Sequence, residues 1–314
     1  MSATIEELPA TPVPAGRPFV LRPSVREALW GFVFIGPWLI GLVLFIAGPM
    51  IVSLVMSLTD FNLVHPETTK FIGIDNYVRM TNDPTIGQSL IATLKFALLA
   101  IPITMGASLG FALLLNHPKL PAKGPLRTLV YMPLMIPLVA STLVWMGFLN
   151  TDTGWLNQIL GSLGLPQPDW INSETWIYPA LSMIGLWAIG NFMIINIAGL
   201  QSVPTELYEA AKMDGAGAWR RFREITLPLL RPLIGIQLLF GVIYATYQFT
   251  IPYVMLGANP GKDADLLMTL IVRQSFDNSL FGYGAAISTL LMIGMAVWVL
   301  VWYQLFKRDL EVAA

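Results

Sequence analysis

A stripe of polar and aromatic side chains runs through an otherwise apolar stretch at 229–256. Gln237, Gly241, Tyr244 and Gln248 follow one another at helical intervals, which places them on one face of a helix. Amides donate and accept hydrogen bonds and a tyrosine ring offers a flat apolar face, a combination that suits the hydroxyls and ring of a sugar. Asn191, in the preceding apolar stretch, could contribute similarly. Polar residues in membrane helices also join helices to one another, and that alternative stays open for each position.

Residues that could carry out other chemistry are scarce. The sequence has no cysteine, both histidines (His65 and His117) lie outside the apolar stretches, and no Asp or Glu lies within one. A nucleophile with an adjacent base is therefore not expected, nor is coupling to a proton or ion flow through buried ionisable groups. The segment GANPGKD at 257–263 lacks the spacing and the hydroxyl residue of a phosphate-binding loop. We predict no catalytic, cofactor-binding or metal-binding residue, and we expect the chain not to be an enzyme.

The composition predicts that these residues are positioned by membrane-spanning helices. Of the 314 residues, 55% are hydrophobic and only 12% are charged. A bilayer core needs about 20 mostly apolar residues per helix. Six stretches meet that length, at about 30–58, 88–116, 126–150, 176–200, 229–256 and 284–306. The predicted fold class is therefore all-α and polytopic, with kinks at the prolines inside the spans.

Basic residues predict the orientation, because lysine and arginine are retained on the cytoplasmic side. With both termini inside, thirteen of the 18 Lys and Arg residues fall in cytoplasmic segments and four fall outside. The external ones are Lys70, Arg79, Lys262 and Arg273. We expect a disordered, proline-rich cytoplasmic tail at 1–28, a transmembrane domain at 29–308 and a cytoplasmic end at 309–314.

The polar segment 201–228 is predicted to form a helix–turn–helix elbow in the cytoplasm. Thr205 could cap a first helix, Gly215 could supply the left-handed turn that ends it, and Trp219 to Glu224 could form a second helix. Pro228 would then restart the chain as the fifth span. An alternative is that Arg220, Arg221 and Arg223 rest on anionic lipid headgroups.

The order of residues in this elbow resembles the EAA signature of ABC importer permeases. Glu209-Ala210-Ala211 is followed at fixed spacing by Gly215, Ile225 and Leu227-Pro228, without a gap. In that family the loop is the coupling helix, which sits in a cleft of an ATPase subunit. The resemblance implies that these seven residues couple the chain to an ATPase, with Glu209 and Gly215 most directly involved.

Further likeness extends from about residue 30 to the carboxyl end. The runs SLTDFNL at 57–63, FIGIDNYVRM at 71–80 and TGWLNQILGSLGL at 153–165 resemble the external loops of sugar permeases of the maltose and glycerol-3-phosphate type. They are similar to the MalF-like member of a permease pair. LGANPG at 256–261 departs from the usual Thr-x-Gly-Gly-Pro of that branch.

The resemblance implies a six-helix type I ABC importer transmembrane domain in the inner membrane of a bacterium. Its expected partners are a second homologous permease, two ATPase subunits that carry ATP and Mg²⁺, an external solute-binding protein, membrane lipid and a di- or oligosaccharide, but no nucleic acid. This chain would move the sugar by alternating access. Import of glycerol phosphate or another small solute by the same machinery remains an alternative, as do a membrane-embedded enzyme and a structural scaffold.

Overall fold

The computed structural model describes residues 25–257 and 264–313, which form two compact units divided after Val52. In the first unit, α1 (Val25–Leu42) leads through a π-helical turn (Val43–Ala47) into α2 (Gly48–Met56), whose last residues belong to the second unit. Gly48 N–H donates to the Val43 carbonyl, five residues back, immediately before Pro49. Helix α1 begins four residues before the predicted domain boundary, and the rest of the predicted tail lies outside the described residues.

The loop that follows α2, in the second unit, is closed by one buried amide. The loop contains a short 3-10 turn (Pro66–Thr68) and α3 (Asp75–Asn82). Asn76 is buried, and its Nδ2 donates to the carbonyls of Ser57 at 2.9 Å and Thr59 at 2.8 Å. An antiparallel bridge between Thr59 and Phe71 closes the loop further. The two segments singled out in this loop, 57–63 and 71–80, are thus held against each other.

Helix α4 (Pro84–Asn116) is the longest element of the middle of the chain, and the helix pair that follows it is sharply bent. Helix α5 (Lys123–Tyr131) and a 3-10 turn (Met132–Met135) meet α6 (Leu138–Phe148) at 99°. Pro137 is the N-cap of α6 and has extended backbone angles, because proline cannot continue the hydrogen-bond pattern of the preceding turn. The stretch predicted as a span at 126–150 is therefore a bent helix pair and not one straight helix, and the expected kink at a proline is present.

The predicted fourth span is also broken. A short helix, α7 (Trp155–Ser162), precedes α8 (Ile177–Trp187), which meets α9 (Gly190–Ser202) at 58°. No proline lies at this second break. A Cβ on Gly190 would come within 2.8 Å of Tyr131 Cα, so the chain changes direction where it passes directly over α5.

The elbow connects α9 to the fifth span, and the helix of its second arm continues through Pro228 without a break. It contains α10 (Thr205–Met213) and α11 (Ala218–Arg221), and a π-helical turn (Phe222–Thr226) joins α11 to α12 (Leu227–Thr246). Helix α13 (Thr250–Leu256) follows. Leu227 N–H donates to the Phe222 carbonyl, so the helix passes through Pro228 with a widened turn. The prediction that Pro228 restarts the chain is corrected accordingly.

The last elements are α14 (Leu267–Val272), a π-helical turn (Arg273–Asp277) and α15 (Phe281–Ala313). Helix α15 continues through 309–313, the segment predicted as a separate end. The LGANPG and GANPGKD segments lie largely outside the described residues.

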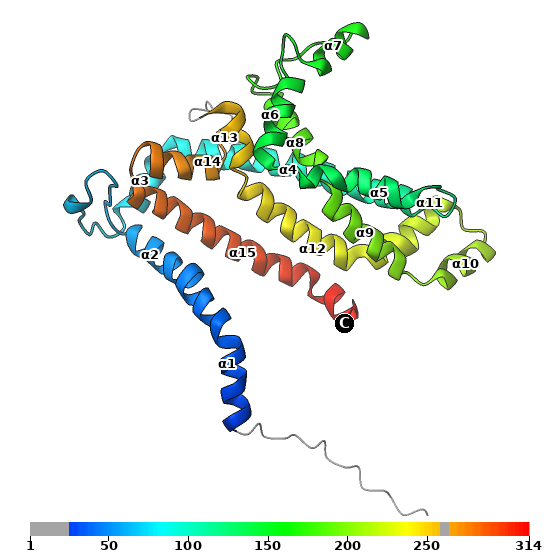
Figure 1. The fold of residues 1–314 in the computed structure, drawn as a ribbon, viewed down its shortest axis with the longest axis horizontal. Helices are drawn as coiled ribbons and strands as arrows, with labels where there is room; N and C mark the ends of the chain where they lie inside the picture. The colour runs from blue at the N-terminus through cyan, green and yellow to red at the C-terminus, as the bar shows by residue number, and fades with distance from the viewer. Residues whose placement is uncertain (1–24, 258–263, 314) are drawn as a thin grey trace, which may run out of the picture. The chain divides into compact units, whose positions relative to one another are not determined.

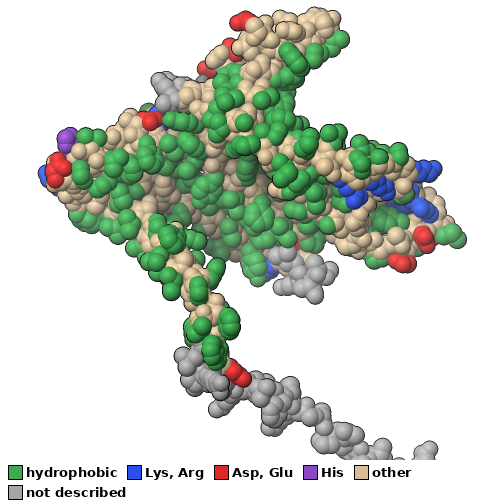
Figure 2. Space-filling view, in the orientation of Figure 1, with side chains coloured by type: hydrophobic (Ala, Val, Ile, Leu, Met, Phe, Trp, Pro, Cys, Tyr) green, Lys and Arg blue, Asp and Glu red, His purple; other side chains and the backbone are tan. Residues whose placement is uncertain are grey.

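Helix α4 lies at the centre of the second unit, against α8, α9 and α12, and α12 also packs against α15 (Figure 1). Within the described residues, four helices are long and apolar enough to cross a membrane, or six if each bent pair is one span. Figure 2 shows Lys and Arg side chains gathered over the α5 and α11 end of this unit, where the elbow lies. The expected all-α, polytopic class is confirmed.

Candidate functional site

The first arm of the elbow, α10, begins with a proline. Pro204 is the N-cap, with extended backbone angles, and Thr205 is the first helical residue and makes no side-chain cap hydrogen bond. The predicted capping role of Thr205 is therefore wrong. Glu206 lies in the first turn and Lys212 in the last, an arrangement that suits the helix dipole.

The first arm ends at Gly215 in the left-handed conformation that the sequence predicts, with φ of 75°. Gly215 N–H donates to the Lys212 carbonyl at 3.0 Å, and Ala216 N–H donates to the Ala211 carbonyl at 2.8 Å. This pair of bonds is a Schellman motif, which satisfies helix-end carbonyls and turns the chain sharply. Gly215 thus sets the angle between the two arms.

The outer face of the elbow is open to solvent. Glu209 and Ala210 are exposed, Ala211 is half-buried, and the Met213 side chain is 89% exposed. On the second arm, Ile225 is half-buried while Leu227 and Pro228 are exposed. Small residues beside exposed apolar ones leave a surface that another protein can approach closely.

One side-chain contact holds the two arms together. Tyr208 Oη and Thr226 Oγ1 are 2.8 Å apart, linking α10 to the turn that enters α12. Arg220 pairs with Glu224 at 2.9 Å along the second arm, and both side chains are largely exposed. The elbow is thus a compact bracket between α9 and α12.

A cavity of about 860 Å³ lies further along the same helices. Its walls come from α4, the bend between α5 and α6, the α8–α9 pair and α12. Most of the lining is apolar or aromatic, and its polar members are Thr104, Ser141, Ser182, Asn191, Tyr244 and Tyr247. A volume of this size, apolar with a few polar groups, is typical of small-molecule sites.

The structure divides the predicted polar stripe. Tyr244 and Gly241 line the cavity, as does Asn191 on α9. Gln248 is buried behind the wall, and its Nε2 donates to Tyr244 Oη at 3.1 Å. Since Gln248 uses an acceptor site of that hydroxyl, the tyrosine O–H is left to point elsewhere. Within the described residues Gln248 therefore supports the wall but does not line it.

Gln237 lies between helices. It is 2% exposed, and its Nε2 donates to Asn196 Oδ1 at 2.8 Å. Asn196 Nδ2 in turn lies 3.4 Å from Gln237 Oε1 and 3.2 Å from Ser108 Oγ on α4. The sequence left open whether Gln237 lines the substrate path or joins helices, and these hydrogen bonds show that it joins helices.

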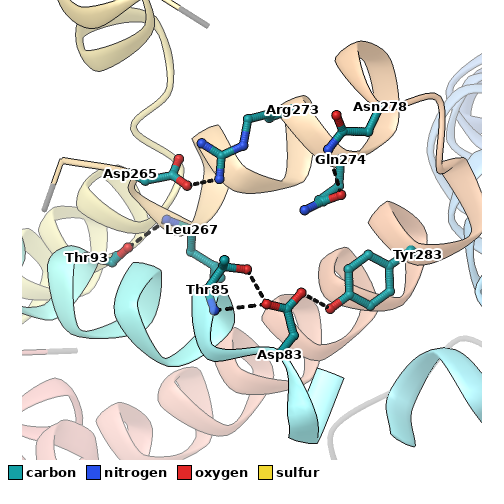
Figure 3. Close-up of polar contacts among 9 residues, drawn as sticks. All are labelled: Asp83, Thr85, Thr93, Asp265, Leu267, Arg273, Gln274, Asn278 and Tyr283. Carbon is teal, nitrogen blue, oxygen red and sulfur yellow. Dashed lines mark hydrogen bonds and ion pairs between the residues drawn. The ribbon is translucent and has the colours of Figure 1, made fainter. Parts of the chain in front are cut away.

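A separate set of polar contacts lies at the starts of α4 and α15 and around α14 (Figure 3). Asp83 caps α4 by accepting from Thr85 N–H at 2.9 Å, and it also accepts from Tyr283 Oη at 2.7 Å. Burial raises the pKa of Asp83, but these bonds and the nearby Arg79 guanidinium outweigh it and hold the pKa below its ordinary value. These contacts link α4 to the start of α15.

A second set of polar contacts in the same region ties α14 to α4. Thr93 Oγ1 accepts from Leu267 N–H at 2.9 Å, and Asp265 pairs with Arg273 (Figure 3). Burial raises the pKa of Asp265, and the Arg273 guanidinium opposes that shift only in part. Sequence reasoning missed both sets of contacts, because their members lie in four separate segments.

Sequence reasoning also missed several cavity residues. Ser141 and Ser182 are isolated small polar residues within apolar helices, and nothing in their spacing marks them. Tyr247 carries a weak signal, because it follows Tyr244 by three residues and so shares its side of α12.

A bundle of bent membrane helices around a cavity, with an exposed bracket at one end, defines a polytopic membrane transport subunit. The chain belongs to the binding-protein-dependent transport system inner membrane component family, which it matches over residues 102–312. The family resemblance drawn from the EAA signature is confirmed.

Two relatives illustrate the likeness. The chain is 34% identical to the sulfoquinovosyl glycerol transport system permease protein SmoG of Agrobacterium fabrum, over 85% of this chain and 87% of that one. It is 32% identical to the trehalose/maltose transport system permease protein MalF of Thermococcus litoralis, over 90% and 96%. The fold also matches a chain of a bacterial ABC transporter involved in import of the acidic polysaccharide alginate, with a TM-score of 0.76 at 22% identity, over 90% and 97%.

Proposed function

We propose that this chain is a sugar-translocating permease subunit of an ATP-driven importer. It works with a second homologous permease, two ATPase subunits that bind ATP and Mg²⁺, and an external solute-binding protein. Both termini lie in the cytoplasm. The relatives named for sulfoquinovosyl glycerol and for trehalose and maltose support a carbohydrate as the substrate.

The observation that carries the proposal is the continuity between elbow and cavity. Helices α9 and α12 enter and leave the elbow, and the same two helices supply Asn191 and Tyr244 to the cavity wall. A displacement of α10 by an ATPase therefore reaches the wall through helices alone. Glu209, Ala210, Ala211 and Gly215 form the first arm that the ATPase would hold, and Ile225, Leu227 and Pro228 the second.

The chemistry of the cavity suits a neutral polyol. Its aromatic members, including Tyr244, Tyr247 and Trp187, offer faces for sugar rings, and its hydroxyls and the Asn191 amide offer hydrogen bonds. The described lining residues include no Lys or Arg that would favour an anionic solute. Closing the ATPases would tilt α9 and α12 and expose the cavity to the opposite side of the membrane.

The direct test is reconstitution of the complete complex in proteoliposomes with its binding protein. ATPase activity and uptake are measured with maltose, trehalose, an arabinotriose and glycerol 3-phosphate. Stimulation of both activities by a sugar supports the proposal. Stimulation by glycerol 3-phosphate alone would replace the substrate class, and uptake that does not need ATP would reject the mechanism.

The cavity is tested by Tyr244→Ala. Loss of the ring and of its hydroxyl should lower sugar uptake at least tenfold while the complex still assembles and hydrolyses ATP at its basal rate. Tyr303→Ala, which removes an exposed tyrosine of α15 that does not line the cavity, is the control and should transport normally. Normal uptake by the Tyr244 variant would exclude that residue from the substrate path.

A further inference from the structure

The buried cluster of Ser108, Asn196 and Gln237 lies where the elbow meets the cavity. Its three side chains come from α4, α9 and α12, and each is at most 2% exposed. Asn196 is the centre, since it accepts from Gln237 and donates to Ser108. We call these three residues the amide cluster.

On each of the three helices, the member of the amide cluster lies at the same spacing from a residue that lines the cavity. Thr104 on α4, Phe192 on α9 and Gly241 on α12 line the cavity, and each lies four residues from its cluster member. Four residues are about one helical turn, or roughly 6 Å along the axis. In each helix the cavity residue is on the side away from the elbow. The cluster is therefore a polar layer one turn from the cavity, toward the cytoplasmic end.

Between the cluster and the elbow, α9 and α12 are in close contact at Gly199. A Cβ on Gly199 would come within 2.8 Å of Leu230 Cδ2 and 2.6 Å of Leu233 Cδ2, so the helices touch there without intervening space. Met193, Ile197, Leu200 and Leu230 form one buried cluster with Ala112 and Leu115 of α4. The Tyr208 and Thr226 contact closes the elbow itself.

The apolar contacts and the hydrogen bonds differ in how strongly they fix the register of the helices. Apolar burial is non-directional, so it does not by itself require particular pairs of groups to face each other. The hydrogen bonds of the amide cluster are directional and are made in a surrounding where no water replaces them. A shift of α9 against α12 would leave buried amide groups unpaired. The cluster thus fixes the register of the three helices.

We propose that the amide cluster is a coupling strut that makes α4, α9 and α12 move as one body when the elbow is displaced. Asn196 is its central positioning residue and Gln237 its partner. The strut rests on the proposed function of this chain as an ATP-driven permease. It carries the movement of the elbow to the cavity wall one turn beyond, and it carries a signal from the outer side back to the ATPases.

The test compares four variants in the complete reconstituted complex. Asn196→Leu leaves the Gln237 amide without its partner, and Gln237→Leu leaves Asn196 with only its contact to Ser108. The double Leu variant removes both amides while keeping apolar packing. The exchange variant, Asn196→Gln with Gln237→Asn, restores an amide pair in the opposite order. Gln201→Leu is the matched control, because Gln201 is an exposed amide on α9 with a single contact of 3.5 Å.

The deciding readout is the ratio of binding-protein-stimulated to basal ATPase activity, with the sugar that the wild-type complex transports best. The double Leu variant should assemble with basal ATPase within twofold of wild type, while the ratio falls close to one and uptake falls at least tenfold. The exchange variant should recover at least half of the wild-type ratio. The Gln201 control should be normal.

A purely structural role would predict something different. It would lower the amount of assembled complex and all rates in proportion, and leave the ratio unchanged. A double Leu variant with a wild-type ratio and wild-type uptake would overturn the strut while the proposed function stands. A wild-type complex that shows neither stimulated ATPase nor uptake would instead reject the proposed function, and the strut with it.

Discussion

Gly215 shows how one residue type determines the shape of the elbow. Its φ of 75° is a conformation that residues with a Cβ rarely adopt, and it closes both bonds of the Schellman motif. Gly217, two residues on, has an extended conformation with φ of −66°. Of these two positions, only 215 needs a glycine for its backbone conformation.

Gly215→Ala should therefore weaken coupling while Gly217→Ala should not. No atom lies within 4 Å of a Cβ at either position, so the two substitutions differ in backbone strain and not in crowding. A left-handed alanine costs about 1 kcal/mol, which favours another turn and another arm angle. We expect stimulated ATPase activity to fall several-fold for Gly215→Ala. Equal activities in the two variants would show that the arm angle is unimportant.

Asp83 gives a pH-dependent prediction. Its pKa is lower in the folded protein than its ordinary value of 3.8, so its contribution to the free energy of unfolding is present above that value. The contribution is lost as the pH falls through the folded-state pKa. Asp83→Ala should lower the melting temperature by about 2 °C at pH 7, from the loss of a cap of about 1 kcal/mol.

The difference in melting temperature between wild type and Asp83→Ala should be smaller at pH 3 than at pH 7. The lower pH lies below the ordinary pKa of 3.8, so part of the stability contributed by the ionised carboxylate is lost there. Melting curves of the detergent-solubilised protein at the two pH values measure this. Asn82→Ala, a change at the exposed neighbour, is the control. A difference of the same size at both pH values would contradict an ionised Asp83 in the folded protein.

At the residue scale, the sequence indicated which residues share a helix face but not which side chains they contact in the folded protein. The conformation of Gly215 was predictable, because few residues other than glycine end a helix in that way. The stripe on α12 was recognised, yet cavity-lining and helix-joining residues need the same helical spacing. Only the position of Asn196 on another helix distinguishes Gln237 from Tyr244, and that position is a property of the folded protein.

At the scale of elements, one buried amide holds together residues 151–175, which the sequence predicts to be external and which we call the external lobe. Asn157 is 2% exposed, and its Nδ2 donates to the carbonyls of Thr151 and Pro168, both at 3.0 Å. Its Oδ1 accepts from Trp170 Nε1 at 2.8 Å. The side chain therefore joins the start, the helix and the end of the lobe.

Asn157→Ala should open this lobe without disturbing the spans. It leaves buried polar groups unpaired, each costing about 1–3 kcal/mol. Limited digestion with chymotrypsin is suitable, because residues 151–175 contain tryptophan and leucine but no lysine or arginine. Cleavage in the lobe should become several-fold faster. Gln158→Ala, at the exposed amide next to it, should digest at the wild-type rate, and equal rates for both would show that Asn157 is not the closing residue.

The boundaries of elements were predictable where the chain itself marks them. Long apolar runs located the spans, and Pro137 marks the bend between α5 and α6. The break at 188–189 carries no such mark, because it arises from the close approach of Gly190 to Tyr131. Pro228 was misinterpreted because a π-helical turn precedes it, in which Leu227 N–H bonds the Phe222 carbonyl. The helix therefore continues through a proline that has no N–H to donate.

For the whole molecule, the orientation in the membrane remains a prediction, and the absence of cysteine makes it directly testable. Met213 on the elbow is 89% exposed and Trp155 on the external lobe is 70% exposed, so cysteine at either position should be reachable by a reagent. The distribution of Lys and Arg predicts that the elbow is inside and the lobe outside.

Met213→Cys and Trp155→Cys should therefore label from opposite sides. In cells with a permeabilised outer membrane, a membrane-impermeant maleimide should modify the Trp155 variant at once and the Met213 variant only after detergent solubilisation. The wild-type chain, without cysteine, measures background. Labelling of the Met213 variant in unbroken cells would place the elbow outside, out of reach of any cytoplasmic ATPase. Because coupling, the strut and the cavity movement all require force from the cytoplasm, that single result would remove their common driving force.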